Sequence, residues 1–513
     1  MKVLGIGDGP DASAVLAIDD RIVAAEPQAA FDGRPRSRAF PWAAVDDVLR
    51  RWDVDPREID EIAVAGRFTP PFFLRRNPGL RRVARDGFSV TLDLTIFYQA
   101  MLRQTGLGAL EADRAAEWLE RQFRKGGFRG RILLVDIHTA LANTAYRSQA
   151  LDDLLLVTLH PMGDGVSLAV HRAAYGQVDR VFEQRGFSSL HVHMRRCAEA
   201  IGMPDARAMW GVAGRHADPD LVRLLAKSLR PLEGYLSRNS YPFPERGIAY
   251  DALRKVPLEV AAASVLENLM VAVRGVVARH VRQYRIPRIA LAGEVFESTR
   301  VVSAIAEIDG VESVSCPSEP GFGALAWGAA AHVAGLPMHA HSRHGADDFS
   351  ALGGQPVDWG DVARVIVAGG RVAYISGRSG LRDWDDRVIL TRADRGSYIP
   401  GQRVLWSGRG PGSVPASIRP ALRNGAAAAE MDADFCFVNP SAAATDGRVR
   451  LVPIDDGVIG ALLQRLAASD LHTLRSTRLT RRGCPVARGP EALEAAREAG
   501  VDLLVAGQTV VRL

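Results

Sequence analysis

Residues 131–171 read RILLVDIHTALANTAYRSQALDDLLLVTLHPMGDGVSLAVH, and this stretch decides the expected fold. An apolar run, Ile132–Val135, meets the polar residues at 136–138, and a helix of small residues is expected over Thr139–Tyr146. A second apolar run, Leu154–Leu159, ends at Met162-Gly163-Asp164-Gly165. This order is typical of a β–α–β unit in a mixed sheet. Because α/β proteins bind ligands where strands end, we expect a functional site here.

Length and composition indicate a soluble protein of two or three domains. The chain has 513 residues, 47% hydrophobic and 24% charged, as in ordinary globular proteins. The net charge of +5 comes from arginines spread along the chain, with no basic block, so nucleic-acid binding is not expected. The four cysteines are isolated, as expected for free thiols in a reducing compartment. The start lacks the zones of a signal peptide and no apolar run would span a bilayer, which predicts a cytoplasmic protein without a membrane partner.

The first residues predict a β-hairpin whose turn has two interpretations. Strands are expected at Val3–Ile6, Ala14–Ile18 and Arg21–Ala25, and the first turn reads GDGPDAS. Actin-like ATPases open in this way, with the amides of the turn facing a nucleotide's phosphates. The candidate residues for that role are Asp8, Gly9, Asp11 and Ser13. On the turn alone, however, a plain hairpin turn is favoured.

Hydrophobic periodicity and composition predict further helices, a strand and a linker. Helices are expected at Trp42–Trp52 and Val260–Tyr284, and a strand at Arg288–Ala292. The polar, Gly- and Pro-containing stretch Gly335–Asp348 is interpreted as a domain boundary, and its three histidines as part of a linker rather than a metal site.

Two further groups of basic residues are expected to support the fold or to face solvent. The arginine cluster Arg75, Arg76, Arg81 and Arg82 could face a phosphate or an acidic partner, but a solvated basic surface is favoured. His191 and His193 lie two apart on an expected helix and face different ways, so they make a poor metal pair.

Several segments, in order along the chain, resemble the motifs of one family. Residues 5–14 read GIGDGPDASA, residues 317–330 read PSEPGFGALAWGAA, and residues 377–390 read GRSGLRDWDDRVIL. Together with residues 131–171, their order and spacing resemble those of the carbamoyltransferases that modify antibiotics and nodulation factors. The resemblance runs from Gly5 to Leu513 and includes the closing helix and strand.

The resemblance implies that the family's iron site has lost most of its ligands in this chain. Its ligand positions correspond to Ile137, Leu141, His160 and Phe322, and three of these have no ligating atom. Since a metal needs several oxygen or nitrogen ligands at one point, the iron site is expected to be lost. The family's polar residues that persist are His138 and Asp164, the candidate catalytic residues.

The resemblance also implies sites for ATP and carbamoyl phosphate. Glu294 replaces the family's second glycine at the nucleotide, where an added carboxylate disfavours an anionic ligand. Guanidinium groups bind phosphate oxygens in pairs, and three arginines match the family's donor site if two residues are deleted. Pairing of these arginines with the nearby Asp383, Asp385 and Asp386 is the alternative. The candidate nucleotide- and donor-binding residues are Asp8, Gly9, Asp11, Ser13, Gly163, Gly165, Gly293, Arg378, Arg382 and Arg387.

From the family follow a fold and two hypotheses for function. The fold class is α/β: an actin-like (TsaD-like) domain at 1–335, a linker at 336–350 and a smaller YrdC-like domain at 351–513. The first hypothesis is a diverged enzyme of natural-product biosynthesis that transfers a carbamoyl group from carbamoyl phosphate and ATP to a small-molecule acceptor without iron. The second is a non-catalytic partner of an active carbamoyltransferase paralogue. The protein is expected to form a homo- or heterodimer.

Overall fold

The structure, a computed structural model, describes most of the N-terminal two-thirds of the chain and parts of the remainder. The described residues are 1–34, 36–77, 89–147, 152–185, 189–203, 209–210, 212–213, 216–232, 235–238, 248–317, 321–336, 354–375, 387–392, 402–406, 436–438, 449–451, 462, 465–466, 468–469, 473–481, 484–486, 489–507 and 509–513. The predicted linker lies outside these residues except for Leu336.

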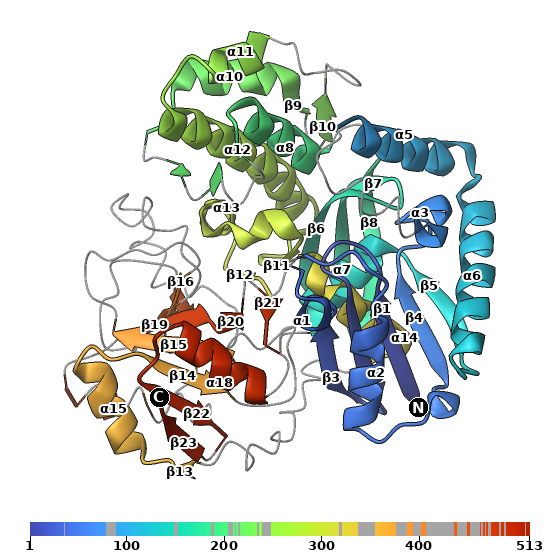
Figure 1. Ribbon diagram of the computed structural model, residues 1–513. Coiled ribbons are helices and arrows are strands. Elements are labelled where there is room, and N and C mark those ends of the chain that lie inside the picture. Colours follow the sequence, from blue (N-terminus) through green and yellow to red (C-terminus); the bar gives the residue numbers. More distant parts are fainter. Residues whose placement is uncertain are drawn as a thin grey trace.

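Two five-stranded sheets of the same topology make up the N-terminal part (Figure 1). The first has the order β3-β2-β1-β4-β5 and the second the order β12-β11-β6-β7-β8. In each, the first three strands in sequence form an antiparallel meander, and the last two are parallel to the first strand. The fold is therefore mixed α/β with a repeated strand order, which is compatible with the expected actin-like domain.

The strand bounds agree closely with the apolar runs of the sequence. The first sheet comprises β1 (Lys2–Gly7), β2 (Ser13–Ile18), β3 (Arg21–Pro27), β4 (Glu61–Ala65) and β5 (Arg131–Val135). The second comprises β6 (Leu154–Gly163), β7 (Val166–Ala174), β8 (Gln177–Arg185), β11 (Arg288–Ala292) and β12 (Ser313–Ser315). A separate two-stranded pair joins β9 (Leu229–Leu232) to β10 (Tyr235–Arg238).

The prediction that the two apolar runs of residues 131–171 share one sheet is wrong. Strand β5 is the edge of the first sheet, β6 is the centre of the second, and α7 (Ile137–Arg147) crosses between the sheets. Hydrophobic periodicity indicates that a segment is a strand, but it does not indicate the strand's partner.

Alternate side chains of the strands enter different cores. In β6, Leu154 and Leu156 face an inner cluster, whereas Leu155, Val157 and Leu159 face an outer one. The inner cluster contains side chains of both sheets together with those of α7 and α14 (Leu325–Val333), so these two helices lie between the sheets.

The inner helices pack closely because their contact faces carry small residues. A Cβ on Gly328 of α14 would lie 1.9 Å from the carbonyl oxygen of Ala140 in α7. A Cβ on Gly5 of β1 would lie 2.2 Å from the carbonyl oxygen of Ala326. The Ala- and Gly-rich composition of these segments is thus required by the short distance between backbones.

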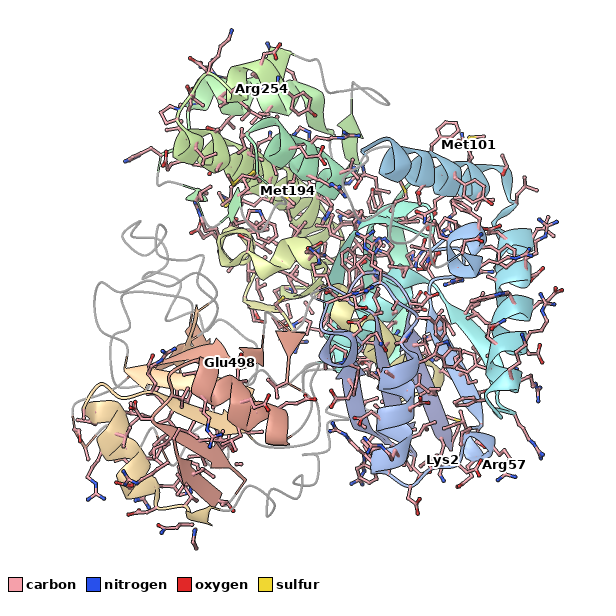
Figure 2. All side chains as sticks on the ribbon, in the orientation of Figure 1. Lys2, Arg57, Met101, Met194, Arg254 and Glu498 are labelled. Atoms are coloured by element: carbon pink, nitrogen blue, oxygen red, sulfur yellow. The ribbon has the colours of Figure 1, made fainter. Side chains whose placement is uncertain are left out.

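Further helices cover the outer faces of both sheets. The first sheet is covered by residues of α2 and α6, and the second by those of α8, α10, α11, α12 and α13. Figure 2 shows Met194 of α8 within this second outer layer. Helices of the N-terminal part are α1 (Ala29–Asp32), α2 (Trp42–Arg51), η1 (Pro56–Glu58), α3 (Phe72–Arg76), α5 (Ser89–Thr105), α6 (Gly108–Lys125), α8 (Leu190–Ala200), α10 (Pro219–Ser228), α11 (Ile248–Leu253), α12 (Leu258–Tyr284), η3 (Glu294–Glu297), α13 (Thr299–Ala306) and η4 (Phe322–Ala324).

The long helix α12 is a core helix. Among the described residues it is the one helix long and apolar enough to cross a membrane, but 67% of its most apolar window is buried inside the protein. Its apolar face packs on β6 and β11 through side chains such as Leu266 and Val273. The sequence prediction of a long amphipathic helix at this position is confirmed.

The C-terminal part contains a sheet of its own, drawn in orange and red in Figure 1. Its nine strands have the order β13-β23-β22-β14-β15-β19-β16-β18-β17. The strands are β13 (Gln355–Pro356), β14 (Val372–Ile375), β15 (Arg387–Arg392), β16 (Gln402–Trp406), β17 (Cys436–Val438), β18 (Val449–Leu451), β19 (Thr473–Arg478), β22 (Leu503–Ala506) and β23 (Thr509–Arg512); β20 (Thr480–Arg481) and β21 (Cys484–Pro485) pair separately. Helices α15 (Trp359–Val367) and α18 (Gly489–Glu498) contribute to two separate cores on this sheet.

The close contact between α7 and α14 generates a first prediction. The substitution Gly328→Ala should lower the free energy of unfolding by roughly 1–3 kcal/mol, because the added methyl meets backbone that must move. Urea denaturation followed by circular dichroism measures the change. Gly9→Ala is the matched control, since a Cβ on Gly9 meets no atom within 4 Å. Equal stability of both variants would contradict the packing described.

Candidate functional site

The predicted site residues gather where β1, β4, β5 and β6 end and the first turn of α7 begins. Asp8 follows β1, Asp164 lies in the β6–β7 turn, and His138 lies in the first turn of α7. Segment 65–69 starts at the last residue of β4 and lies between the two aspartates. Its amides donate to Asp164, and its carbonyl oxygens accept from the arginine that pairs with Asp8. We call this segment the β4 turn.

Asp8 is held by an arginine in a buried ion pair. Arg75 Nε donates to Asp8 Oδ2 at 2.9 Å and Nη2 to Oδ1 at 3.3 Å, and both side chains are fully buried. The same guanidinium binds the carbonyl oxygens of Gly66 at 2.8 Å and Thr69 at 3.2 Å. The prediction that Arg75 belongs to a solvated basic surface is wrong, whereas its neighbour Arg76 is exposed. No local pattern in the sequence indicates this ion pair, because Asp8 and Arg75 lie 67 positions apart.

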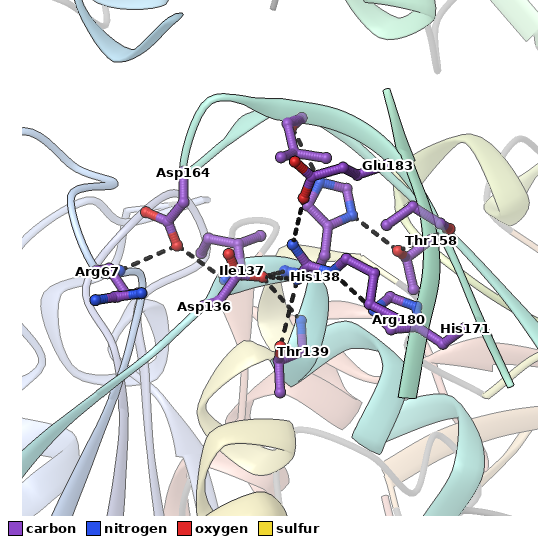
Figure 3. A network of polar contacts seen from close by, with 12 residues as sticks. Arg67, Asp136, Ile137, His138, Thr139, Thr158, Asp164, His171, Arg180 and Glu183 are labelled. Atoms are coloured by element: carbon purple, nitrogen blue, oxygen red, sulfur yellow. Dashed lines mark hydrogen bonds and ion pairs between the residues drawn. The ribbon is translucent and has the colours of Figure 1, made fainter. Parts of the chain in front are cut away.

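Asp164 is held by backbone amides. Its Oδ2 accepts from the amides of Arg67 and Ile137 at 3.0 Å each, and Oδ1 from Phe68 at 2.9 Å. Its own amide donates to the Thr69 hydroxyl at 2.8 Å. Burial raises the pKa of Asp164 to about 6, the Asp136 carboxylate adds to the rise, and the three amides oppose it. The carboxylate therefore joins the β4 turn to the start of α7, which Figure 3 shows.

His138 is completely buried, and both of its ring nitrogens are hydrogen-bonded. Nδ1 lies 2.8 Å from the Thr158 hydroxyl, and Nε2 lies 3.0 Å from the carbonyl oxygen of Val166. Because a carbonyl only accepts, Nε2 carries the proton. Nδ1 of the neutral ring then accepts the Thr158 hydroxyl proton, for which the carbonyl oxygen of Ala169, 3.3 Å away, is the competing acceptor. Burial lowers the pKa of His138 to about 4, although the Asp136 carboxylate opposes this. The ring is thus neutral and tied to β6 and β7.

Behind His138 lies a network of charged side chains, shown in Figure 3. Asp136 caps α7 by accepting from the amides of His138 at 2.9 Å and Thr139 at 3.1 Å, and it also accepts from the guanidinium of Arg180. Arg180 further binds Glu183 at 3.1 Å. Although burial raises the pKa of Asp136, the Arg180 charge and the hydrogen bonds from Arg180 and the Thr139 amide lower it more, so its pKa lies below the ordinary value.

His171 belongs to the same network. Its Nε2 accepts from Arg180 Nε at 3.3 Å, while its Nδ1 is buried and has no hydrogen-bond partner. Burial lowers the pKa of His171 well below the ordinary value, and the Arg180 charge adds to this effect.

The positions of the family's iron ligands do come together in space, but as packed side chains. The rings of His160 and Phe322 meet edge to face with centroids 5.0 Å apart. A Cβ on Gly163 would lie 2.6 Å from Cγ2 of Ile137 and 3.2 Å from Nδ1 of His160. That Nδ1 already accepts from the amide of Met162 at 3.2 Å.

These residues do not fit an iron ion. Ile137, Leu141 and Phe322 offer hydrocarbon, and all three are buried in the inner core. Among the described residues, no group of three or more histidine, cysteine, aspartate or glutamate side chains could hold a metal ion. A first-row metal needs such a group, so the donor set here is unsuitable.

A cluster of charged side chains, the Arg36 cluster, lies beside Phe322. Arg36 Nη2 lies 3.0 Å from Glu294 Oε1, its Nε lies 3.5 Å from Asp11 Oδ2, and its guanidinium lies 5.8 Å from the Phe322 ring centre. His191 Nε2 lies 3.5 Å from Glu294 Oε2. The cluster joins the first sheet's loops to α8 and η3 of the second. It is partly exposed, with 34% of the Arg36 side chain accessible and 13% of His191.

The sequence did not predict Arg36 as a site residue, and it indicated other roles for Glu294 and His191. Glu294 was expected to repel a nucleotide, and its carboxylate instead pairs with Arg36. His191 was interpreted as structural or surface, and it lies beside a carboxylate. The signal that could have found them is weak: Arg36 and Glu294 are charged residues that lie close in sequence to Gly33 and Gly293.

The remaining predicted residues are placed as follows. Ser13 is buried and donates to the carbonyl oxygen of Gly323 at 3.2 Å. Gly165 packs under α5, since its Cβ would lie 2.5 Å from Cβ of Arg103. Gly293 has a φ of 133°, and its Cβ would lie 2.1 Å from the carbonyl oxygen of Leu159, so close contact with β6 requires glycine there. Arg387 begins β15, whereas Arg378 and Arg382 lie outside the described residues.

Comparisons with known proteins give distant structural likenesses. No family model and no curated protein match the sequence. Full-length HypF, in a crystal structure of its phosphate- and nucleotide-bound form, is similar at a TM-score of 0.39 and 10% identity, over 65% of this chain and 46% of HypF. The chain therefore spans just under half of HypF's length. Lmo2764, a putative N-acetylmannosamine kinase from Listeria monocytogenes, is similar at a TM-score of 0.32 and 12% identity, over 65% of this chain and 98% of that chain. Both scores lie below 0.5, so neither likeness defines the fold of this chain.

Buried neutral histidines predict a loss of stability in mild acid. Burial lowers the pKa of His138 to about 4 and those of His160 and His171 well below the ordinary 6.5. Below pH 6.5 the unfolded chain therefore binds protons that the folded chain does not, so stability present above pH 6.5 is lost as the pH falls. Asp164 acts in the opposite sense between about pH 4 and 6, because its raised pKa makes the folded chain bind the extra proton.

The substitution His171→Gln should remove the contribution of one histidine to the pH dependence of the unfolding free energy. We expect the slope of the unfolding free energy against pH, between pH 6.5 and 5, to fall by about one proton, roughly 1.4 kcal/mol per pH unit. Urea titrations at several pH values measure it. His216→Gln, at an exposed position, controls for the loss of an imidazole. An unchanged slope in His171→Gln would mean that His171 is charged in the folded protein.

Proposed function

We propose that this chain is a diverged carbamoyltransferase-type protein with an actin-like N-terminal and a YrdC-like C-terminal domain, which acts as a non-catalytic partner subunit of an active carbamoyltransferase in cytoplasmic natural-product biosynthesis. The order of the family's motifs along the chain and the repeated strand order of the two sheets support the ancestry. The proposal for the role depends on one observation: the carboxylates at both turns are bound by the protein's own groups. Asp8 binds Arg75, and Asp164 binds three amides.

Opening these turns for a phosphate or its metal would be costly. Removing Arg75 from Asp8 would leave a buried charge without its partner, which typically costs 3–5 kcal/mol. The carboxylate of Asp164 would have to give up three amide hydrogen bonds, each worth about 1.5–3 kcal/mol when the acceptor is charged. A ligand of ordinary affinity would spend much of its binding free energy on this rearrangement. These costs support a structural role for the turns over nucleotide binding.

An apolar patch on the N-terminal part supports a partner role. Phe73, Phe97, Met101, Leu107 and Leu110 are between 37% and 56% exposed and belong to α3, α5, α6 and the α5–α6 connection. Figure 2 shows Met101 on the outer side of α5. Clustered large apolar side chains on a surface are typical of protein interfaces. We propose that a carbamoyltransferase paralogue covers this patch.

Carbamoyl transfer without iron is the second candidate. The Arg36 cluster favours it, since His191 beside the carboxylate of Glu294 is an arrangement in which an imidazole accepts a proton. In this reading an acceptor hydroxyl gives its proton to His191, its oxygen bonds to the carbamoyl carbon, and AMP leaves from carbamoyl adenylate. ATP and carbamoyl phosphate would supply that intermediate in the C-terminal domain.

The isolated chain should contain no iron and turn over neither ATP nor carbamoyl phosphate. Metal analysis of the purified protein and a pyrophosphate-release assay measure this, with an active family member as the positive control. One equivalent of iron, or ATP turnover that requires it, would contradict the proposal. Turnover without iron that falls at least about 100-fold in His191→Asn would establish the second candidate instead.

The patch should be required for association with the paralogue. When the two chains are co-expressed and one is tagged, Met101→Glu should reduce co-purification at least tenfold, because a buried interface disfavours an unpaired charge. Val271→Glu, at a 45% exposed position of α12 away from the patch, is the matched control. If both variants co-purify as the parent chain does, this patch is not the interface.

A further inference from the structure

The β4 turn directs several carbonyl oxygens at one buried point. Those of Gly66 and Thr69 lie 2.8 and 3.2 Å from Arg75 Nη2, that of Ala65 lies 3.5 Å from the same atom, and that of Arg67 lies 3.5 Å from Nη1. The Asp8 carboxylate completes the set on the other side. One carboxylate and four carbonyl oxygens thus surround a single guanidinium.

This set of groups has the chemistry of a cation-binding site. All the protein groups bonded to the guanidinium are acceptors, and they include one full negative charge. The guanidinium presents donors in a plane, and Nε and Nη2 match the two oxygens of Asp8 side by side. The pair is fully buried, so water does not screen it.

The backbone conformation of the β4 turn brings its carbonyl oxygens together around this guanidinium. Gly66 has a φ of 95°, and a Cβ on it would lie 1.7 Å from the carbonyl oxygen of Thr69. The backbone is therefore folded so tightly that successive carbonyls converge. On the other side of the turn, the amides of Arg67 and Phe68 point to Asp164. Carbonyls face a cation and amides face an anion, which is the arrangement expected of a preformed site.

We propose that the Asp8 pocket is a guanidinium-binding site that the chain fills with its own Arg75. Arg75 acts as a built-in ligand: removing its side chain leaves a pocket that takes a small guanidinium cation from solution. The site excludes an exchangeable cation in the wild-type protein because its occupant is covalently attached. Neither the family resemblance nor the function proposed above is needed for this inference.

Chemical rescue tests the proposal. Arg75→Ala should lower the thermal midpoint of the full chain, and millimolar methylguanidinium chloride should raise the midpoint of this variant by roughly 2–4 °C. The same salt should not raise the midpoint of the wild-type protein or of Arg76→Ala, the control at the exposed neighbouring arginine. The double variant Asp8→Asn with Arg75→Ala should lose the rescue, since it lacks the carboxylate.

Other outcomes decide against the proposal. No shift in a folded Arg75→Ala protein, or a shift of equal size in Arg76→Ala, overturns it. Rescue by Mg²⁺ or K⁺ but not by methylguanidinium overturns the assignment to guanidinium cations. If Arg75→Ala is recovered only as insoluble protein, refolding from urea with and without methylguanidinium replaces the melting experiment, together with the milder Arg75→Gln variant. Equal yields with and without the cation, for both variants, overturn the proposal as well.

Discussion

The N-terminal part depends on opposite charges held on the two sides of one turn. Arg75 binds the carbonyls of the β4 turn and Asp8, while Asp164 binds the amides of the same turn and of Ile137. Asp8 ends the first strand of one sheet, and Asp164 lies between the first two strands of the other. The chain of bonds from Asp8 to Asp164 therefore connects the two sheets. Because Asp8, Arg75 and Asp164 are fully buried, their bonds act in a medium of low dielectric, where they are strong and their loss is expensive.

This connection explains how two acidic residues are accommodated in the protein interior at these turns. A buried carboxylate is tolerated only with a partner, whether a ligand or a group of the protein. Here Arg75 and three amides provide partners that do not dissociate. The neighbouring Ile137 and Phe322 fill space with hydrocarbon side chains that leave no side-chain polar atom unsatisfied. The inner core is thereby continuous from α7 to α14.

Sequence predicted the features that depend on local pattern. The strands β1, β2, β3, β5 and β11 and the helix α12 were found within two residues of their observed bounds, because alternation and the 3.6-residue period are set by neighbouring residues. Partners distant in sequence could not be found in this way. Arg75 carries the same side chain as Arg76, and nothing in the sequence says that one is buried against Asp8 while the other faces water. The pairing of Arg36 with Glu294 and the assignment of β5 and β6 to different sheets were missed for the same reason.

The Arg36 cluster and the β4 turn hold charged residues in two different ways. At the turn, charges are fully buried and saturated, so they stabilise one conformation and leave no group to react. In the cluster, Arg36 and His191 remain partly exposed, whereas the Glu294 side chain between them is only 6% exposed, and the three belong to segments from both sheets. Partly exposed pairs are worth little in stability, so stability alone does not account for three ionisable groups converging from distant segments. If any chemistry persists in the N-terminal part, the cluster is therefore the place where ligand contact costs the fold least.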